Sequence, residues 1–185
     1  MPPLVRLAYH GEPGAFAQAA CERFDPAALA LPCPTAEAAI AAVNARCADA
    51  AVLPVHNSVA GPVRQNLALL PASGLIETAR VELAITMALL ALPGVPLADI
   101  GTIASHPVAL AQCSRLLARL GAAIEPAITT AAAAAALARS GARDRAVLAS
   151  AHAAALYGLG VLDGDAGDDP AAVTIFAVLV APTRD

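Results

Sequence analysis

Short apolar segments alternate with helical patterns along this chain of 185 residues, and this alternation limits the possible folds more than any other feature. From Pro107 to Leu120, apolar residues recur at helical spacing, and Gly121 follows as a stop signal. Elsewhere, short runs rich in apolar and β-branched residues are typical of buried strands, at 5–9, 50–55, 99–104, 145–150 and 173–181. Strands that alternate with helices indicate an α/β protein with largely parallel sheets.

Polar residues or glycines follow several of these strands. They stand at 10–14, at His56-Asn57-Ser58, at Ser105-His106 and at Thr129-Thr130. Because ligands of parallel α/β sheets bind at the carboxyl ends of the strands, these tips are candidate binding residues. They offer N–H groups and hydroxyls with few carboxylates, which suits a small anionic ligand. The pattern predicts two lobes that face a cleft, the first at 1–78 and 166–185 and the second at 79–165.

The composition argues against several classes of protein. Hydrophobic residues make up 58% of the chain, but the most apolar run, 83–92, is far shorter than the ~20 residues of a spanning helix. The net charge of −4 and the lack of a Lys/Arg cluster argue against binding to nucleic acid. The N-terminus does not resemble a signal peptide. We therefore expect a cytoplasmic protein with no membrane or nucleic-acid partner.

Cysteines and acidic residues do not follow a metal-binding pattern. The four cysteines show no Cys-x-x-Cys spacing and are expected to be reduced thiols. The acidic run 163–169 lacks the spacing and the final Glu of a calcium loop. Since no glycine-rich nucleotide motif is present either, we predict neither a metal nor a cofactor.

The segment from Ser105 to Cys113 joins a predicted strand to a predicted helix. Pro107 suits the first helical turn because no N–H is needed there, and Ser105 or His106 can cap the helix. A helix N-terminus beside a hydroxyl and an imidazole can bind an anion, although the same residues would also simply start a helix.

This segment resembles the Ser-His-Pro-x-Ala-Leu-Ala-Gln-Cys motif of prephenate dehydratases, which convert prephenate to phenylpyruvate, CO2 and water in phenylalanine biosynthesis. Four further segments are similar to motifs of that family in the same order: 9–16, 54–61, 153–159 and 174–176. The resemblance covers nearly the whole chain. It implies a two-lobed, periplasmic-binding-protein-like (type 2) fold, a carbon-oxygen lyase without a cofactor, and a homodimer. The regulatory ACT domain of many members is expected to be absent, because the chain ends at Asp185.

The resemblance also implies roles for individual residues. In the family, the Thr of a Thr-Arg-Phe motif protonates the leaving hydroxyl, and here Thr174 holds that position. The segment Ser105-His106 is the second predicted catalytic element. The predicted substrate-binding residues come from the remaining motifs and their surroundings: Gly11, Gly14, His56, Asn57, Ser58, Arg64, Thr129, Thr130 and Phe176.

Ile175 stands where the family motif has the Arg that binds a substrate carboxylate. Loss of one charge-assisted hydrogen bond costs ~1.5 to 3 kcal/mol, which corresponds to about a ten- to hundredfold loss in binding or rate. His56 and Arg64 replace a Glu and an Asn of the family pattern and add positive charge beside Asn57-Ser58. We predict that together they supply the missing carboxylate contact.

Two alternative functions stay open at this point. A prephenate decarboxylase of secondary metabolism would remove the carboxylate and keep the hydroxyl, and loss of the motif Arg favours it, whereas retention of Thr174 and Asn57-Ser58 disfavours it. A non-catalytic small-anion binding protein on the same fold would bind without turnover. The identity of the product separates these possibilities.

Overall fold

The computed structural model describes residues 5–182, which form two compact units. Unit 1 contains residues 5–12, 16–84 and 173–182, and unit 2 contains residues 13–15 and 85–172. The sequence placed the boundaries instead at 78/79 and 165/166, and placed 13–15 in the first lobe. The boundaries lie later because residues 76–84 pair with the last strand of unit 1, and because Ala166 and Asp168 donate backbone hydrogen bonds to Met87 and Gln112 of unit 2.

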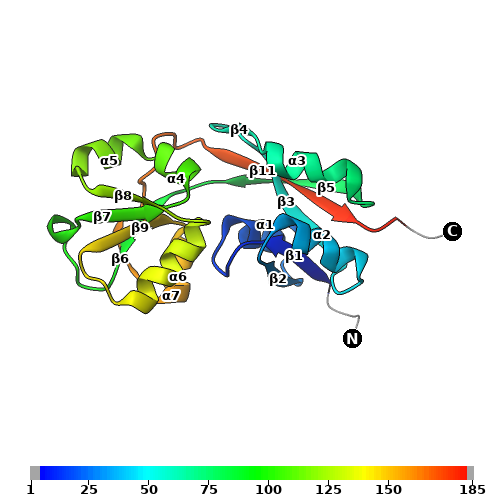
Figure 1. Ribbon diagram of the computed structural model, residues 1–185, viewed down its shortest axis with the longest axis horizontal. Coiled ribbons are helices and arrows are strands. Elements are labelled where there is room, and N and C mark those ends of the chain that lie inside the picture. The colour runs from blue at the N-terminus through cyan, green and yellow to red at the C-terminus, as the bar shows by residue number, and fades with distance from the viewer. Residues whose placement is uncertain (1–4, 183–185) are drawn as a thin grey trace. The chain divides into compact units, whose positions relative to one another are not determined.

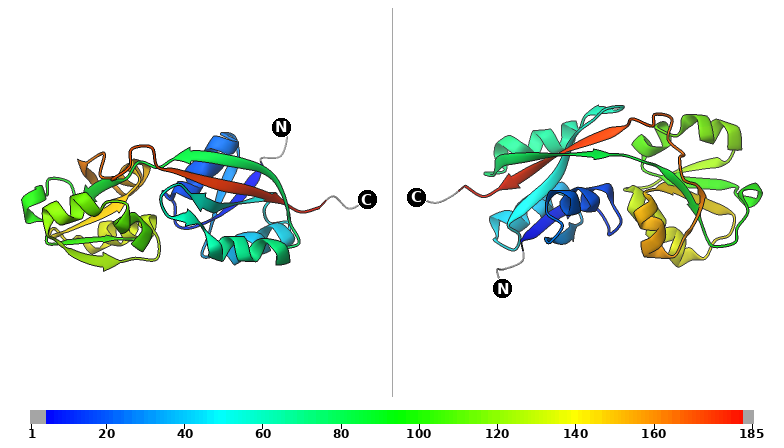
Figure 2. Two further views of the ribbon diagram at one scale, coloured as in Figure 1. Left: turned by 90° about the horizontal axis from the view of Figure 1, so that it is seen from above. Right: turned by 180° about the vertical axis from the view of Figure 1, so that it is seen from behind.

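Unit 1 contains a six-stranded mixed sheet with the order β2-β1-β3-β11-β5, and β4 pairs with β3 (Figure 1). Its first three strands are parallel, whereas β11 runs antiparallel to both β3 and β5. Figure 2 shows β5 and β11 side by side along their length. The strands are β1 (Arg6–His10), β2 (Leu29–Cys33), β3 (Ala50–Asn57), β4 (Gly61–Pro62), β5 (Ile76–Ala84) and β11 (Val173–Val180).

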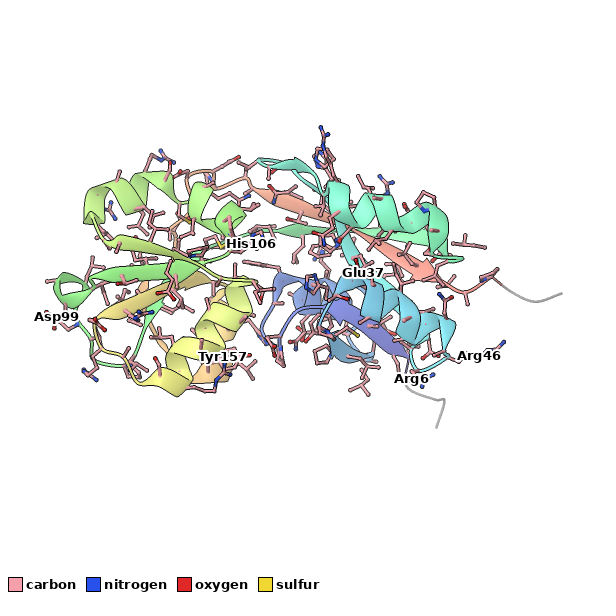
Figure 3. The ribbon with its side chains drawn as sticks, viewed as in Figure 1. Arg6, Glu37, Arg46, Asp99, His106 and Tyr157 are labelled. Atoms are coloured by element: carbon pink, nitrogen blue, oxygen red, sulfur yellow. The ribbon has the colours of Figure 1, made fainter. Side chains whose placement is uncertain are left out.

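Three helices cover this sheet: α1 (Phe16–Phe24), α2 (Ala36–Asn44) and α3 (Arg64–Leu69), which continues into a 3-10 turn at Leu70–Ala72. Thr35 caps α2, because its hydroxyl oxygen accepts a hydrogen bond from the Ala38 amide at 3.1 Å. Apolar side chains of α2 pack on the sheet against Leu53, Val55 and Leu179. At the start of β1, Arg6 forms an ion pair with Asp49 and donates a hydrogen bond to the carbonyl of Arg46 (Figure 3).

Unit 2 contains a five-stranded sheet with the order β10-β6-β9-β7-β8. Strand β7 is parallel to both of its neighbours, β8 and β9, while β6 is antiparallel to β9 and β10. The strands are β6 (Ala88–Ala91), β7 (Thr102–Ser105), β8 (Ala123–Pro126), β9 (Arg145–Ala149) and β10 (Gly160–Asp163). A 3-10 turn, η2 (Leu97–Asp99), precedes β7, so the predicted strand 99–104 begins later than expected.

Helices lie on both sides of this sheet, with α4 and α5 on one side and α6 and α7 on the other (Figure 1). They are α4 (Pro107–Ala111), α5 (Ser114–Leu120), α6 (Thr130–Ser140) and α7 (Ala151–Tyr157). The single helix predicted from Pro107 to Leu120 is therefore interrupted at Gln112 and Cys113. Within residues 5–182, no helix combines the length and the apolar character needed to span a membrane.

The interruption is stabilised by Asp168, a residue of the predicted polar loop. Its carboxylate accepts hydrogen bonds from the Ser114 amide at 2.8 Å, from the Ser114 hydroxyl at 2.6 Å and from the Arg115 amide at 3.1 Å. The backbone carbonyl of Asp168 also accepts a hydrogen bond from the Arg115 guanidinium. Asp168 thus caps α5 from a distant part of the chain.

Replacement of Asp168 with Ala is expected to lower the free energy of unfolding by about 1 kcal/mol at pH 7. Burial raises the pKa of Asp168, but the hydrogen bonds from Ser114 and Arg115 lower it by more, so the pKa lies below its ordinary value of 3.8. The capping stabilisation is therefore full above that value and is lost as the pH falls through the lower, folded-state pKa. Urea unfolding of the wild-type protein and the Asp168→Ala variant, at pH 7 and at acid pH, measures the difference in the free energy of unfolding.

The matched control for this prediction is Asp165→Ala, which removes an exposed carboxylate of the same loop. We expect Asp165→Ala to leave the unfolding free energy within about 0.5 kcal/mol of the wild-type value. Equal destabilisation by the two replacements would contradict a capping role for Asp168.

Candidate functional site

Asn57 and Thr174 meet in unit 1, where the end of β3 pairs with the start of β11. The Asn57 side-chain amide donates a hydrogen bond from Nδ2 to Thr174 Oγ1 at 2.9 Å. Both side chains are buried, with 8% of each residue exposed. Because Thr174 Oγ1 accepts this hydrogen bond, the hydroxyl can direct its own proton to another acceptor.

The other end of the Asn57 amide fixes the loop that follows β3. Asn57 Oδ1 accepts hydrogen bonds from the Val59 amide at 3.0 Å and from the Ala60 amide at 2.8 Å. An oxygen that accepts two backbone N–H groups must point toward the loop, so the NH2 group must point toward Thr174. The loop and the Thr174 hydroxyl are therefore oriented by one side chain.

Ser58 extends the pairing beyond the last residue of β3. Its amide donates to the Val173 carbonyl at 2.8 Å, and its hydroxyl oxygen accepts from the Val173 amide at 2.9 Å. Both bonds fix the residue that precedes Thr174. Ser58, predicted to bind substrate, thus also holds the start of β11 in place.

Ile175 packs against the apolar cluster between α2 and the sheet of unit 1. The position at which the family motif has an Arg is therefore a half-buried apolar residue that packs against the hydrophobic core here. His56 and Arg64 are both exposed, the former beside Pro62 of β4 and the latter at the first position of α3. No ion pair involves Arg64 within residues 5–182.

The glycines of the first predicted tip have structural contacts. Gly11 and Gly14 adopt positive φ angles of 125° and 87°, which favour glycine. The Gly11 amide donates to the Cys33 carbonyl at 3.0 Å. The Gly14 carbonyl accepts from the Ser150 hydroxyl at 2.8 Å, and a Cβ atom on Gly14 would lie 3.2 Å from Ala153.

Ser105 and Phe176 were predicted to contact the substrate, but both are buried in the structure. Ser105 is 0% exposed, and its hydroxyl donates to the Leu148 carbonyl at 2.6 Å, so it joins β7 to β9 in place of the catalytic role that the motif predicts. Phe176 is 2% exposed and belongs to the core, so it has no surface to offer to a substrate.

His106 and Thr129 cap helices in unit 2. His106 Nδ1 accepts a hydrogen bond from the Val108 amide at 3.2 Å at the start of α4 (Figure 3). A ring nitrogen that accepts carries no proton, so the neutral imidazole has its proton on Nε2 and can donate it. Thr129 Oγ1 accepts from the Ala132 amide at 3.0 Å, and Thr130 is the first, half-buried residue of α6.

A cavity of about 310 Å³ lies between α6 and the sheet of unit 2, but neither Thr129 nor Thr130 lines it. Its lining is mostly alanine and other apolar residues, and its guanidinium, Arg145, is paired with Glu125 at 2.6 Å. The cavity is therefore a poor match for the small anion that the strand tips suggest.

Three polar residues that the sequence reasoning did not select have defined contacts. Ser150 caps α7 and donates to Gly14, and the Tyr157 hydroxyl donates to the Pro13 carbonyl at 2.7 Å (Figure 3). Asn66 is 5% exposed, and its Nδ2 donates to the Pro54 carbonyl at 2.8 Å. Asn66 lies outside the segments that resemble family motifs, whereas Tyr157 lies within one of them, 153–159, which was its signal.

Comparison with known proteins places these residues in a family. A family model described as prephenate dehydratase matches residues 7–184. The chain is 42% identical over 177 residues to arogenate dehydratase/prephenate dehydratase 6, chloroplastic, of Arabidopsis thaliana. That match covers 95% of this chain and 43% of the relative, so the chain spans less than half the length of that relative.

Two solved structures are similar along nearly the whole chain. Prephenate dehydratase from Arthrobacter aurescens, in complex with L-Phe, is 35% identical with a TM-score of 0.89, covering 97% of this chain and 61% of that one. GqqA, described as a novel type of quorum quenching acylase, is 36% identical with a TM-score of 0.88, covering 97% and 65%. These similarities confirm the predicted two-lobed, periplasmic-binding-protein-like (type 2) α/β fold.

The predicted cytoplasmic location is contradicted by the relatives. Several curated plant relatives, including the Arabidopsis thaliana protein above, are named chloroplastic. Composition and the first residues of a sequence therefore do not identify the compartment of this protein.

Proposed function

Because the chain belongs to the prephenate dehydratase family, we propose that it converts prephenate to phenylpyruvate, CO2 and water. The Arabidopsis thaliana relatives and the Arthrobacter aurescens protein are dehydratases named for arogenate, prephenate or both, which supports a carbon-oxygen lyase of aromatic amino acid biosynthesis. The observation that carries the proposal is the buried pair of Asn57 and Thr174. Incubation of the purified protein with prephenate at neutral pH, followed by identification of the product, tests it.

The reaction needs one proton at one oxygen. The ring carboxylate leaves as CO2, and its electron pair enters the ring and completes the aromatic system as the C4 hydroxyl departs. The Thr174 hydroxyl gives its proton to that leaving group, which departs as water, and solvent returns a proton to Thr174. The hydrogen bond from Asn57 supports this step, because it orients the Thr174 proton away from Asn57 and stabilises negative charge that develops on Oγ1.

We propose prephenate in preference to arogenate because of the charges in residues 56–64, the segment that contains Asn57. Arogenate carries an ammonium group where prephenate has a keto group, and a buried or half-buried ammonium requires an anionic partner. None of the residues 56–64, which run from His56 through the loop to Arg64, is acidic. The segment instead offers an imidazole and a guanidinium, which suit a dianionic keto acid. A comparison of kcat/KM for the two substrates measures the preference.

Arg64 is the proposed partner of a substrate carboxylate. Its replacement with Gln keeps much of the side-chain length and removes the charge, so KM for prephenate should rise about tenfold while kcat stays within about twofold. The control is Arg139→Gln, an exposed arginine in the last turn of α6. If Arg64→Gln and Arg139→Gln both keep the wild-type KM, the carboxylate is bound elsewhere.

In unit 2, His106 stays a predicted catalytic residue, which would donate from Nε2, and Thr129 and Thr130 stay predicted substrate-binding residues. The predicted homodimer likewise stays a prediction, which sedimentation equilibrium of the purified protein tests.

A further inference from the structure

The strands β3 and β11 change register just before they reach Asn57 and Thr174. Over most of their length the pairing is regular, from Val180 opposite Ala50 to Phe176 opposite Pro54. At the next step Ile175 lies opposite His56, so Val55 has no counterpart on β11. This extra residue is a β-bulge, a device that changes the direction of the side chains that follow it.

The bulge decides which side chain Thr174 meets. If the regular pairing continued without the extra residue, Thr174 would lie opposite His56. Because a shift of one residue reverses the face on which each side chain lies, Asn57 would then no longer be directed at Thr174. The hydrogen bond from Asn57 Nδ2 to Thr174 Oγ1 therefore depends on the extra residue in β3.

Two groups from the segment after β4 bind the carbonyls of this bulge. Asn66 Nδ2 donates to the Pro54 carbonyl at 2.8 Å, and the Val63 amide donates to the Val55 carbonyl at 2.9 Å. Pro54 has no N–H with which to join the ladder, which makes a proline in a central strand depend on a bulge. Of these two donors, Val63 uses its backbone amide and Asn66 uses its side chain. The Asn66 residue is 5% exposed.

We propose that Asn66 is a positioning residue, which holds the Pro54 carbonyl and so keeps β3 in the bulged register that sets Asn57 opposite Thr174. Its effect on the reaction rests on the proposed function, whereas its effect on the register does not. Asn66 does not touch the reacting atoms; it acts through the orientation of Asn57.

The test that is independent of catalysis is hydrogen exchange at the amides of Val59 and Ala60, which donate to Asn57 Oδ1. Replacement of Asn66 with Leu keeps the volume and removes the donor. We expect the exchange of both amides to become about tenfold faster, because the loss of a buried hydrogen bond releases the bulge. Gln65→Leu, an exposed neighbour on α3, is the matched control and should leave both rates unchanged.

The second test uses activity. Asn66→Leu should lower kcat about ten- to a hundredfold, as expected for a displaced catalytic group, with KM within about threefold of wild type. In a Thr174→Val background the same replacement should cost little further kcat, because the group that it positions is already missing. A residue with a merely structural role would instead reduce activity by the same factor in both backgrounds.

Asn66→Ser provides a milder change should the leucine variant fail to fold, and we expect the same direction of effects. Unchanged exchange at Val59 and Ala60 in the folded Asn66 variant overturns the proposal, whatever the protein does with prephenate. Absence of turnover by the wild-type protein, with faster exchange in the variant, instead overturns the proposed function and leaves the positioning role of Asn66 intact.

Discussion

Replacement of Thr174 with Val should lower kcat for prephenate about 10²- to 10⁴-fold, the range typical for loss of a group that transfers a proton. Valine has nearly the same shape as threonine, so the β11 backbone and the packing around it should be retained. The replacement removes the hydroxyl group, whose oxygen accepts the hydrogen bond from Asn57 Nδ2 at 2.9 Å. Steady-state rates and the urea unfolding curve of the same variant measure the two effects separately.

The Thr174→Val variant should also lose about 1 to 3 kcal/mol of stability, because the Asn57 amide is left without its buried acceptor. Thr174→Ser is the matched control, since it keeps the hydroxyl and should retain most of the activity. A Thr174→Val variant that turns over prephenate at the wild-type rate would contradict the proton transfer assigned to this residue.

Replacement of Asn57 with Asp should reverse the hydrogen bond at Thr174 and lower kcat about a hundredfold or more. One oxygen of the new carboxylate can still accept from the Val59 and Ala60 amides, so the loop should keep its conformation. The other oxygen stands where Nδ2 stood and can only accept, so the Thr174 hydroxyl must donate its proton to it. That proton is then withheld from the leaving hydroxyl.

The pH dependence of this variant identifies the cause. When the pH falls below the pKa of the introduced carboxyl group, its protonated form can again donate to Thr174, so part of the lost activity should return. Asn44→Asp is the control, because the Asn44 amide donates to the Ser73 carbonyl at 3.0 Å in the same unit, away from the site. That change should affect stability and leave kcat unchanged. Wild-type kcat in Asn57→Asp would contradict the direction of the Asn57 to Thr174 bond.

The helix and strand order was predictable because local signals were strong. Thr35 caps α2 and Thr129 caps α6, as threonines at helix starts commonly do, and the buried strands predicted at 50–55 and 145–150 correspond to β3 and β9. The edge strands β2 and β8 were missed. β2 contains Pro32, which interrupts a strand pattern, and all four residues of β8 are exposed, so neither shows the apolar alternation of a buried strand.

The details of the site were less predictable, because they depend on contacts between distant parts of the chain. Motif similarity selected Asn57 and Thr174 separately, but their contact joins residues 117 positions apart and depends on a bulge in β3 that was not predicted. The motif likewise selected Ser105, whose hydroxyl donates a hydrogen bond to the Leu148 carbonyl on the neighbouring strand. In the sequence, Asp168 was only one of several acidic residues in 163–169. Its capping role was not predicted because Ser114, its partner on α5, is 54 residues away.

Ile175 illustrates how a lost motif residue changes meaning once the structure is known. From the sequence, an isoleucine in place of an arginine implies only a missing carboxylate contact. In the structure Ile175 joins the apolar cluster of unit 1, so a guanidinium at this position would have to leave that cluster. A substrate carboxylate therefore needs another cation, which is why Arg64 is the residue we propose.

The most direct measurement is identification of the product after incubation of the wild-type protein and its Thr174→Val variant with prephenate at neutral pH, where spontaneous acid conversion is avoided. The dehydratase account predicts phenylpyruvate from the wild-type protein and little or none from the variant. A decarboxylated product that keeps its hydroxyl and is not aromatic, or binding of prephenate without turnover, would contradict it.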